Sequence, residues 1–127
     1  AGQAAKLCNN MVLAVQQIAV GEAFVLAEKL GLSAQALFDV ITGATGNCWA
    51  VHTNCPVPGP VPTSPANNAF KPGFATARMN KDLGLAMNAV TSTGSSAPLG
   101  TPAAEIYAAF AAEHPDLDFS AVINTLR

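Results

Sequence analysis

The stretch from Gln3 to Leu30 constrains the fold more than any other part of the sequence, because it contains no proline and only one internal glycine. It is rich in Ala, Leu, Met, Gln and Glu, which are good helix formers. Apolar side chains occur nearly all round such a helix, at Leu7, Met11, Leu13, Ile18, Phe24 and Leu26. A helix that is apolar on every side lies in a core or between subunits. The sequence therefore predicts one long central helix, which ends at Gly31 in the left-handed conformation.

The segment that follows predicts two short helices and a long loop. Ser33 stands where an N-cap belongs, so we expect a short helix over 34–41, closed by Gly43, and a third helix over 45–54. Prolines recur at close intervals over 55–72, which excludes a helix or a central strand. We therefore expect an extended, ordered loop there, and loops of this length tend to carry function.

The C-terminal half predicts three more helices. One spans 74–90. Thr101 is expected to cap a helix over 102–113 that has proline at its first position, and Asp118 to cap the last helix, over 119–126. No stretch alternates apolar and polar side chains in the way of a strand, so the chain is predicted to be all-α. Its 127 residues suffice for one domain with one hydrophobic core.

The chain is poor in charge, with 11% of its residues charged against about 25% in an average soluble domain. Its net charge of −2 and its scattered basic residues do not form the basic stripe of a nucleic-acid binder. The low charge predicts instead that a partner or a second copy covers much of the surface. The longest uncharged helical stretch, 7–21, is interrupted by asparagines and glutamines, so we expect no membrane span and no signal peptide.

The cysteines and histidines predict neither a disulfide framework nor a metal site. Cys8, Cys48 and Cys55 are odd in number and form no Cys-x-x-Cys pair, which favours reduced thiols in an intracellular compartment. His52 and His114 lie far apart and, together with the cysteines, match no zinc-binding spacing.

Lys6 and Asn10 are the first candidates for chemistry, because they lie four residues apart and share one face of the first helix. Together they can present an ammonium and an amide group to one small ligand. A lysine that is partly withdrawn from water gives up its proton more readily and then serves as a general acid or base. A lysine at this helical position more commonly extends its ammonium group into solvent than takes part in a site.

Lys81, Asp82 and Trp49 are the other residues that stand out. Adjacent helical residues point about 100° apart, so Lys81 and Asp82 are not expected to pair with each other. One of them could face a site and the other a structural partner, although the pattern alone favours an ordinary solvated face. Trp49, the only tryptophan, is by default an anchor of a core or an interface.

Motifs along the whole chain resemble the β-hydroxyacid dehydrogenases. Residues 2–10 read Gly-Gln-Ala-Ala-Lys-Leu-Cys-Asn-Asn, which is similar to the family signature Gly-x-x-x-Lys-x-x-x-Asn. The resemblance is closest to the branch of the family that acts on 3-hydroxyisobutyrate. It continues through Cys48-Trp49, Asn-Cys-Pro-Val-Pro-Gly at 54–59, Pro-Ala-Asn-Asn at 65–68, Met-x-Lys-Asp-Leu-x-Leu-Ala at 79–86 and Asp-Phe-Ser-Ala-Val-Ile at 118–123.

This resemblance implies a two-domain enzyme like 6-phosphogluconate dehydrogenase. In such an enzyme an N-terminal Rossmann domain binds NAD, with NADP not excluded, and an all-α C-terminal domain, here residues 1–127, closes the active site and forms dimers. The sequence has no strand followed by Gly-x-Gly-x-x-Gly, so we expect a fragment that lacks its cofactor domain. The family further implies a homo-oligomer in valine catabolism, in the bacterial cytoplasm or the mitochondrial matrix.

Carried over residue by residue, the resemblance implies that Lys6 is the acid–base residue and that Asn10 helps to hold the substrate. Four further positions match residues near the site: Trp49 and Phe74 on the substrate side, and Lys81 and Asp82 on the cofactor side. Lys6 would take a proton from the substrate hydroxyl, while the cofactor takes the hydride, so that 3-hydroxyisobutyrate becomes methylmalonate semialdehyde.

Two alternatives stay open from the sequence. The first is a sister dehydrogenase acting on tartronate semialdehyde, glyoxylate or succinic semialdehyde, although the stretch over 48–59 favours 3-hydroxyisobutyrate. Residues 43–46 depart from the Ser-Ser-Gly common in the family, so local substrate contacts are expected to differ. The second is a non-enzymatic helical interaction module. Such a module suits the charge-poor surface but has no use for a Lys-Asn pair on an apolar helix.

Overall fold

The computed structural model describes residues 2–127, and its regular structure over this range is entirely helical. The elements are α1 (Gly2–Lys29), α2 (Ala34–Thr42), α3 (Trp49–His52), η1 (Pro65–Asn68), α4 (Thr76–Thr93), α5 (Gly100–Glu113) and η2 (Phe119–Thr125), where η marks a 3₁₀-helix. The only β-type pairing within these residues is an isolated bridge between Ala75 and Asp118. The prediction of an all-α fold with a long first helix is confirmed.

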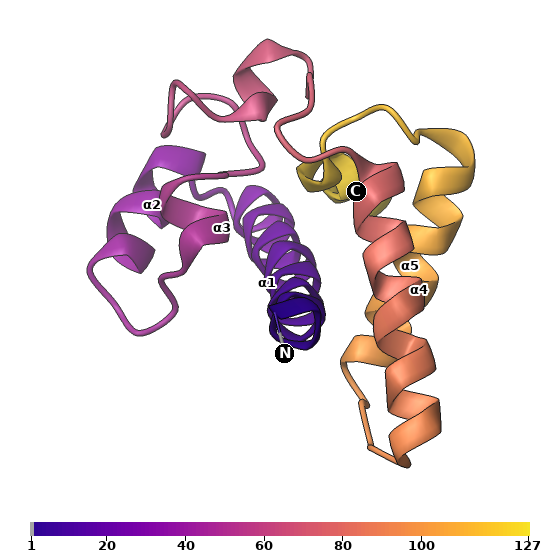
Figure 1. Cartoon of the computed structure of the whole chain (residues 1–127). Coiled ribbons are helices and arrows are strands. Elements are labelled where there is room, and N and C mark those ends of the chain that lie inside the picture. The colour runs from indigo at the N-terminus through magenta and orange to yellow at the C-terminus, as the bar shows by residue number, and fades with distance from the viewer. Residues whose placement is uncertain (1) are drawn as a thin grey trace.

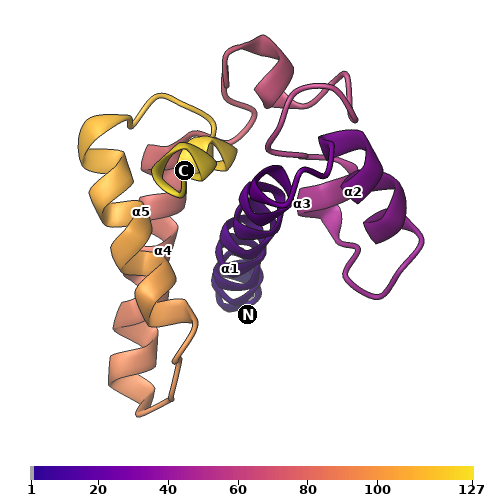
Figure 2. The same cartoon turned by 180° about the vertical axis from the view of Figure 1, so that it is seen from behind.

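Helix α1 is the centre of the molecule. It lies between α2 and α3 on one side and α4 and α5 on the other, and the view from behind shows the same arrangement (Figures 1 and 2). It contacts all four of these helices and also η2. The first half of α1 packs with α4, α5 and η2 around Tyr107 and Phe119, whereas its second half packs with α2, α3 and the proline-rich loop around Phe24. Burial from both sides explains why α1 is apolar nearly all round.

By length and mean hydropathy alone, α1 meets the criteria for a membrane span, contrary to the expectation drawn from its asparagines and glutamines. Its most apolar window has a mean hydropathy of 1.5, and half of that window is buried inside the structure. Two polar side chains on this helix, Asn10 and Gln17, are also buried and hydrogen-bond to other segments. Burial of this kind is what the central helix of a packed helical domain shows.

The helix ends near α2 follow the local sequence rules. Gly31 has a φ of +78°, and the N–H of Leu32 returns to the carbonyl of Ala27 at 2.9 Å, which closes α1 in the Schellman manner. Ser33 Oγ accepts a hydrogen bond from the N–H of Ala36 at 3.1 Å. Both caps are confirmed because they depend only on residues within one turn of each other.

The third helix, the proline-rich loop and the fourth helix differ from the prediction. The third helix covers only Trp49–His52 instead of 45–54, because Cys48 is fully extended and the glycines before it form turns. The proline-rich loop is not extended throughout, since it contains the 3₁₀ turn η1. Helix α4 begins at Thr76 instead of 74 and ends at Thr93 instead of 90. Its start is delayed because the backbone at 74–76 pairs with 117–119.

The last two helices also differ in detail. Helix α5 begins at Gly100, after Leu99, so Thr101 does not cap it. Pro102 is tolerated in the first turn because the N–H groups there have no partner within the helix. A Cβ at Gly100 would lie 2.6 Å from Met11 Sδ, so glycine permits the close approach of α5 to α1. Asp118 does cap the final helix, as predicted, but that helix is 3₁₀ rather than α.

Candidate functional site

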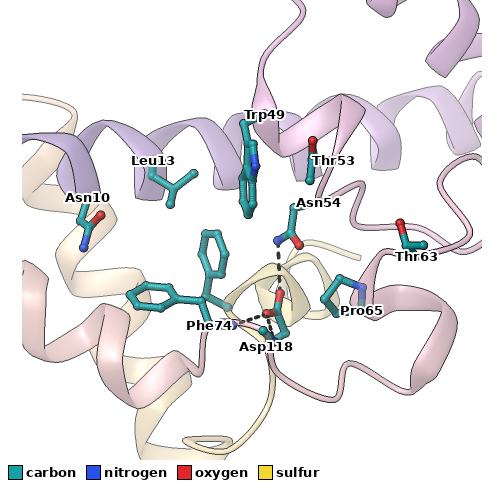
Figure 3. A pocket seen from close by; sticks show the side chains of 11 residues that line it. Asn10, Leu13, Trp49, Thr53, Asn54, Thr63, Pro65, Phe74 and Asp118 are labelled. Atoms are coloured by element: carbon teal, nitrogen blue, oxygen red, sulfur yellow. Dashed lines mark hydrogen bonds between the residues drawn. The ribbon is translucent and has the colours of Figure 1, made fainter. Parts of the chain in front are cut away.

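A cavity of about 420 Å³ lies where five segments of the chain meet (Figure 3). Its volume falls within the range of small-molecule sites. The lining residues are Asn10 and Leu13 of α1, Trp49, Thr53 and Asn54 in and after α3, Thr63 and Pro65 of the proline-rich loop, Gly73 and Phe74 before α4, and Asp118 and Phe119 at the start of η2. The cavity therefore depends on the tertiary arrangement rather than on any single motif.

Aromatic rings form one wall of the cavity. The ring of Trp49 stacks on that of Phe119, with centroids 6.5 Å apart and planes at 17°. The ring of Phe74 meets Phe119 edge-on, with centroids 5.5 Å apart. Phe119 is fully buried, whereas Trp49 is 43% exposed. Trp49 is therefore not an enclosed core anchor, and its ring is available to a ligand.

Asn10 is held by a carboxylate on the neighbouring helix. Its Nδ2 donates to Asp82 Oδ2 at 2.7 Å, which joins α1 to α4. Because an ionised carboxylate only accepts hydrogen bonds, this contact determines which side of the Asn10 amide faces Asp82. Asn9 donates to Asn10 Oδ1 at 3.2 Å. Asp82 thus has a partner on another helix, rather than the solvated position that the sequence pattern alone favoured, whereas the adjacent Lys81 is exposed.

Asp118 is a buried carboxylate that lines the cavity (Figure 3). Its Oδ1 accepts hydrogen bonds from the N–H groups of Gly73 and Phe74, at 3.1 and 3.0 Å. Its Oδ2 accepts from Asn54 Nδ2 at 3.2 Å and from both the N–H and the hydroxyl of Ser120. Only 1% of Asp118 is exposed. This one side chain therefore joins three segments that line the cavity.

The structure brings together some of the predicted site residues and leaves others outside the cavity wall. Asn10, Trp49 and Phe74 line the cavity, and Asp82 contacts Asn10. Lys6 lies one turn before Asn10 on α1 but is exposed and is not part of the wall. The chain by itself therefore does not withdraw Lys6 from water. Lys81 is also exposed, and neither lysine forms an ion pair with any of residues 2–127.

The sequence did not identify Asn54 as a site residue, and it predicted Asp118 only as a helix cap. Both stand inside motifs that carried the family resemblance, and the one local signal was an aspartate directly before a predicted helix, because aspartate suits an N-cap. Apart from Ser120, the hydrogen-bond partners of these two side chains are 37 to 64 residues distant, so no local pattern could have paired them.

Metal ligands and thiols add nothing to the site. Within residues 2–127, no three His, Cys, Asp or Glu side chains lie close enough to hold a metal ion. The three cysteines are free; Cys8 is exposed and Cys55 is buried. Burial raises the pKa of the Cys55 thiol, which keeps it protonated.

A protein-family model described as NAD-binding of NADP-dependent 3-hydroxyisobutyrate dehydrogenase matches residues 1–126. Among curated proteins, a probable 3-hydroxyisobutyrate dehydrogenase of Mycobacterium tuberculosis is 85% identical over the whole chain, which covers 43% of that protein. The mitochondrial 3-hydroxyisobutyrate dehydrogenase of Drosophila melanogaster is 42% identical over 99% of the chain, which covers 39% of its length. The chain thus spans less than half the length of the curated relatives that it matches.

Two solved structures have the same fold. The 3-hydroxyisobutyrate dehydrogenase of M. tuberculosis with L-serine matches with a TM-score of 0.99 at 85% identity, over 100% of this chain and 44% of that one. The 3-hydroxyisobutyrate dehydrogenase of Salmonella typhimurium matches with a TM-score of 0.81 at 26% identity, over 96% of this chain and 41% of that one.

Proposed function

Since the chain belongs to the 3-hydroxyisobutyrate dehydrogenase family, we propose that it is the all-α catalytic domain of an enzyme that oxidises 3-hydroxyisobutyrate to methylmalonate semialdehyde in valine breakdown. The observation that carries this proposal is the cavity in which Asn10, Trp49 and Phe74 meet, with Lys6 one helical turn away. The cavity offers polar groups at its ends and an aromatic wall between them, which suits a small acid with a short apolar part.

Lys6 acts as the acid–base residue in this proposal. In the direction of oxidation its neutral amine accepts the proton from the substrate hydroxyl, and in reduction its ammonium donates that proton to the carbonyl oxygen. A positioned ammonium also stabilises negative charge that develops on that oxygen. Lys6 is exposed in this chain, so the substrate and a second domain must supply the cover that excludes water.

Asn10 orients the substrate, and Asp82 orients Asn10. One N–H of the Asn10 amide is committed to Asp82 at 2.7 Å, so the second N–H is free to donate to a substrate oxygen. Because Asn10 is 8% exposed and held between two helices, its side chain is fixed before the substrate arrives. Trp49 and Phe74 then cover the apolar part of the substrate from the aromatic wall.

The cofactor is NAD in this proposal, with NADP not excluded, and it is held mainly by a Rossmann domain that residues 2–127 do not contain. When bound, this cofactor would supply the acceptor for the hydride that leaves the substrate carbon. The part of the chain that the structure describes has no β-strand from which a glycine turn could hold a pyrophosphate. Lys81 is exposed and unpaired among these residues, so its ammonium suits a single charged contact with the cofactor, beside Asp82.

The activity is tested with the full-length enzyme, by following the reduced nicotinamide formed from 3-hydroxyisobutyrate. We expect a higher kcat/KM for this substrate than for the hydroxy acids that correspond to tartronate semialdehyde, glyoxylate and succinic semialdehyde. Faster turnover of one of these would assign the chain to a sister enzyme. We place the enzyme in the cytoplasm if it is bacterial and in the mitochondrial matrix if it is eukaryotic; the Drosophila relative is named as mitochondrial.

The 127-residue chain alone should bind NAD or NADP no more tightly than millimolar. The cofactor would have Lys81 as its main charged contact, and one charge-assisted hydrogen bond contributes roughly 1.5–3 kcal/mol. Millimolar affinity already requires about 4 kcal/mol. Titration calorimetry with both cofactors measures this, and micromolar binding would place the cofactor site in this domain instead.

The chain should also self-associate, in keeping with the homo-oligomer that we propose. Large apolar side chains are exposed on several helices, among them Val12, Leu26, Leu30, Leu85 and Leu99. Surfaces of this kind are usually covered by a partner. Sedimentation of the purified chain at micromolar concentration should show dimers or larger species, and a monomer at every concentration would count against a hidden interface.

A further inference from the structure

The backbone that leads to Phe74 is strained. Ala69 and Phe70 are consecutive residues in the left-handed region, with φ values of +51° and +57°. Non-glycine residues rarely adopt this conformation, and it persists only where the surrounding structure holds it. The side chain of Phe70 packs against both hydrophobic clusters, and its carbonyl accepts a hydrogen bond from the N–H of Asp118 at 2.8 Å. Other parts of the chain therefore hold the segment over 69–74 in place.

The carboxylate of Asp118 fixes the end of this segment. Its Oδ1 accepts hydrogen bonds from the N–H groups of Gly73 and Phe74 at 3.1 and 3.0 Å (Figure 3). The carbonyl of Phe74 accepts from the N–H of Phe119 at 2.9 Å. The peptide groups on both sides of the Phe74 Cα are thus held. Together they fix the direction in which the Phe74 side chain leaves the backbone.

The second oxygen of the carboxylate keeps the first in position. Oδ2 accepts from Asn54 Nδ2 at 3.2 Å and from both the N–H and the hydroxyl of Ser120. A helix cap requires only the bond to the N–H of Ser120, which a serine supplies without burying a charge. Asp118 is 1% exposed and forms no ion pair with any of residues 2–127, and a buried carboxylate without a counter-ion is costly. Capping alone therefore does not account for an aspartate here.

The ring of Phe74 connects this arrangement to the cavity. The guanidinium of Arg78 lies over the ring, 5.4 Å from its centroid, and the ring of Phe119 meets it edge-on. Phe119 in turn stacks on Trp49. A shift of the Phe74 backbone would move its ring relative to these neighbours and would open the aromatic wall of the cavity.

We propose that Asp118 is a positioning residue for the dehydrogenase reaction and acts through Phe74, whose ring it holds against the apolar part of the substrate. This inference rests on the proposed function, in which Phe74 covers the substrate and Lys6 moves the proton. Loss of the hold on Phe74 weakens the binding of substrate and transition state alike, so KM rises while kcat is kept. A merely destabilised enzyme shows the opposite pattern, because fewer folded molecules lower the apparent kcat and leave KM unchanged.

Asp118→Ser in the full-length enzyme tests the proposal, because a serine keeps the cap on Ser120 while its single oxygen cannot also serve Gly73 and Phe74. We expect KM for 3-hydroxyisobutyrate to rise at least about fivefold, with kcat within about twofold of wild type. Asp118→Asn should raise KM less, since its amide oxygen can still accept from Gly73 and Phe74.

Ser120→Ala is the matched control. It removes one hydrogen bond from Oδ2 of the same carboxylate and leaves the bonds of Oδ1 in place. It should therefore lower Tm and leave KM within about twofold of wild type. A rise in KM equal to that of Asp118→Ser would mean that general loosening of the domain, and not the hold on Phe74, weakens substrate binding.

A double-mutant cycle decides whether the effect of Asp118 passes through Phe74. Phe74→Ala should raise KM by itself, and the further addition of Asp118→Ser should raise it by less than about twofold, because the ring that the carboxylate positions is already absent. Two full effects that multiply would overturn the proposal. A lower kcat with unchanged KM in Asp118→Ser would also overturn it.

Two further measurements separate the remaining outcomes. If Asp118→Ser does not fold, phenyllactate in place of Phe74 decides, because the ester removes only the N–H that Asp118 accepts; an unchanged KM would overturn the proposal. If wild-type enzyme does not oxidise 3-hydroxyisobutyrate, the proposed function fails. A 4-fluorophenylalanine at position 74 then tests Asp118 separately. Its fluorine resonance should shift in Asp118→Asn and Asp118→Ser but not in Ser120→Ala, and an unchanged resonance in every variant would exclude the positioning role.

Discussion

Replacing Lys6 with alanine in the full-length enzyme should lower kcat at least about 100-fold and leave the domain folded. Acid–base groups contribute about 10²–10⁴ in rate, and no other lysine lies within one helical turn of Asn10. The fold should tolerate the change because Lys6 is exposed and alanine is the best helix former. Steady-state kinetics give kcat, and circular dichroism gives the helix content and Tm.

Lys29→Ala is the control for this experiment, because Lys29 is an exposed lysine at the far end of the same helix. Its kcat should stay within about twofold of wild type, as expected for a surface change away from the site. A loss below tenfold in the Lys6 variant, with the fold intact, would mean that another group moves the proton.

Replacing Asp118 with alanine should lower the free energy of unfolding of the 127-residue chain by about 3–5 kcal/mol. The change removes a buried acceptor and leaves the N–H groups of Gly73, Phe74 and Asn54 without it. A hydrogen bond to a charged group contributes about 1.5–3 kcal/mol, and a buried donor left unpaired costs about 1–3 kcal/mol. Urea unfolding, followed by circular dichroism, measures the difference.

Asp116→Ala provides the matched comparison, since Asp116 is an exposed aspartate two residues earlier that accepts no side-chain hydrogen bond among residues 2–127. It should change the free energy of unfolding by no more than about 0.5 kcal/mol. If Asp118→Ala lost less than about 1 kcal/mol, the carboxylate would not be what joins the loop before α4 to η2.

The sequence by itself determined the elements whose causes are local. The length of α1, its end at Gly31, the cap at Ser33 and the cap at Asp118 depend on helix propensity and on backbone groups within one turn. The predicted boundaries failed where distant segments intervene. The start of α4 is an example, because the backbone before it pairs with residues near Asp118 and is thereby kept out of the helix.

The features of the site also fall into those that the sequence predicts and those that only the tertiary structure determines. The spacing of Lys6 and Asn10 follows from the helical repeat, and the family signature drew attention to both. Only the tertiary structure decided that Asn10 turns toward Asp82, and that Asn54 donates to Asp118. Each of these orientations depends on a carboxylate that lies 64 to 72 residues away in the chain. A hydrogen bond of that kind forms only when packing brings the two segments together, and no local pattern in the sequence records it.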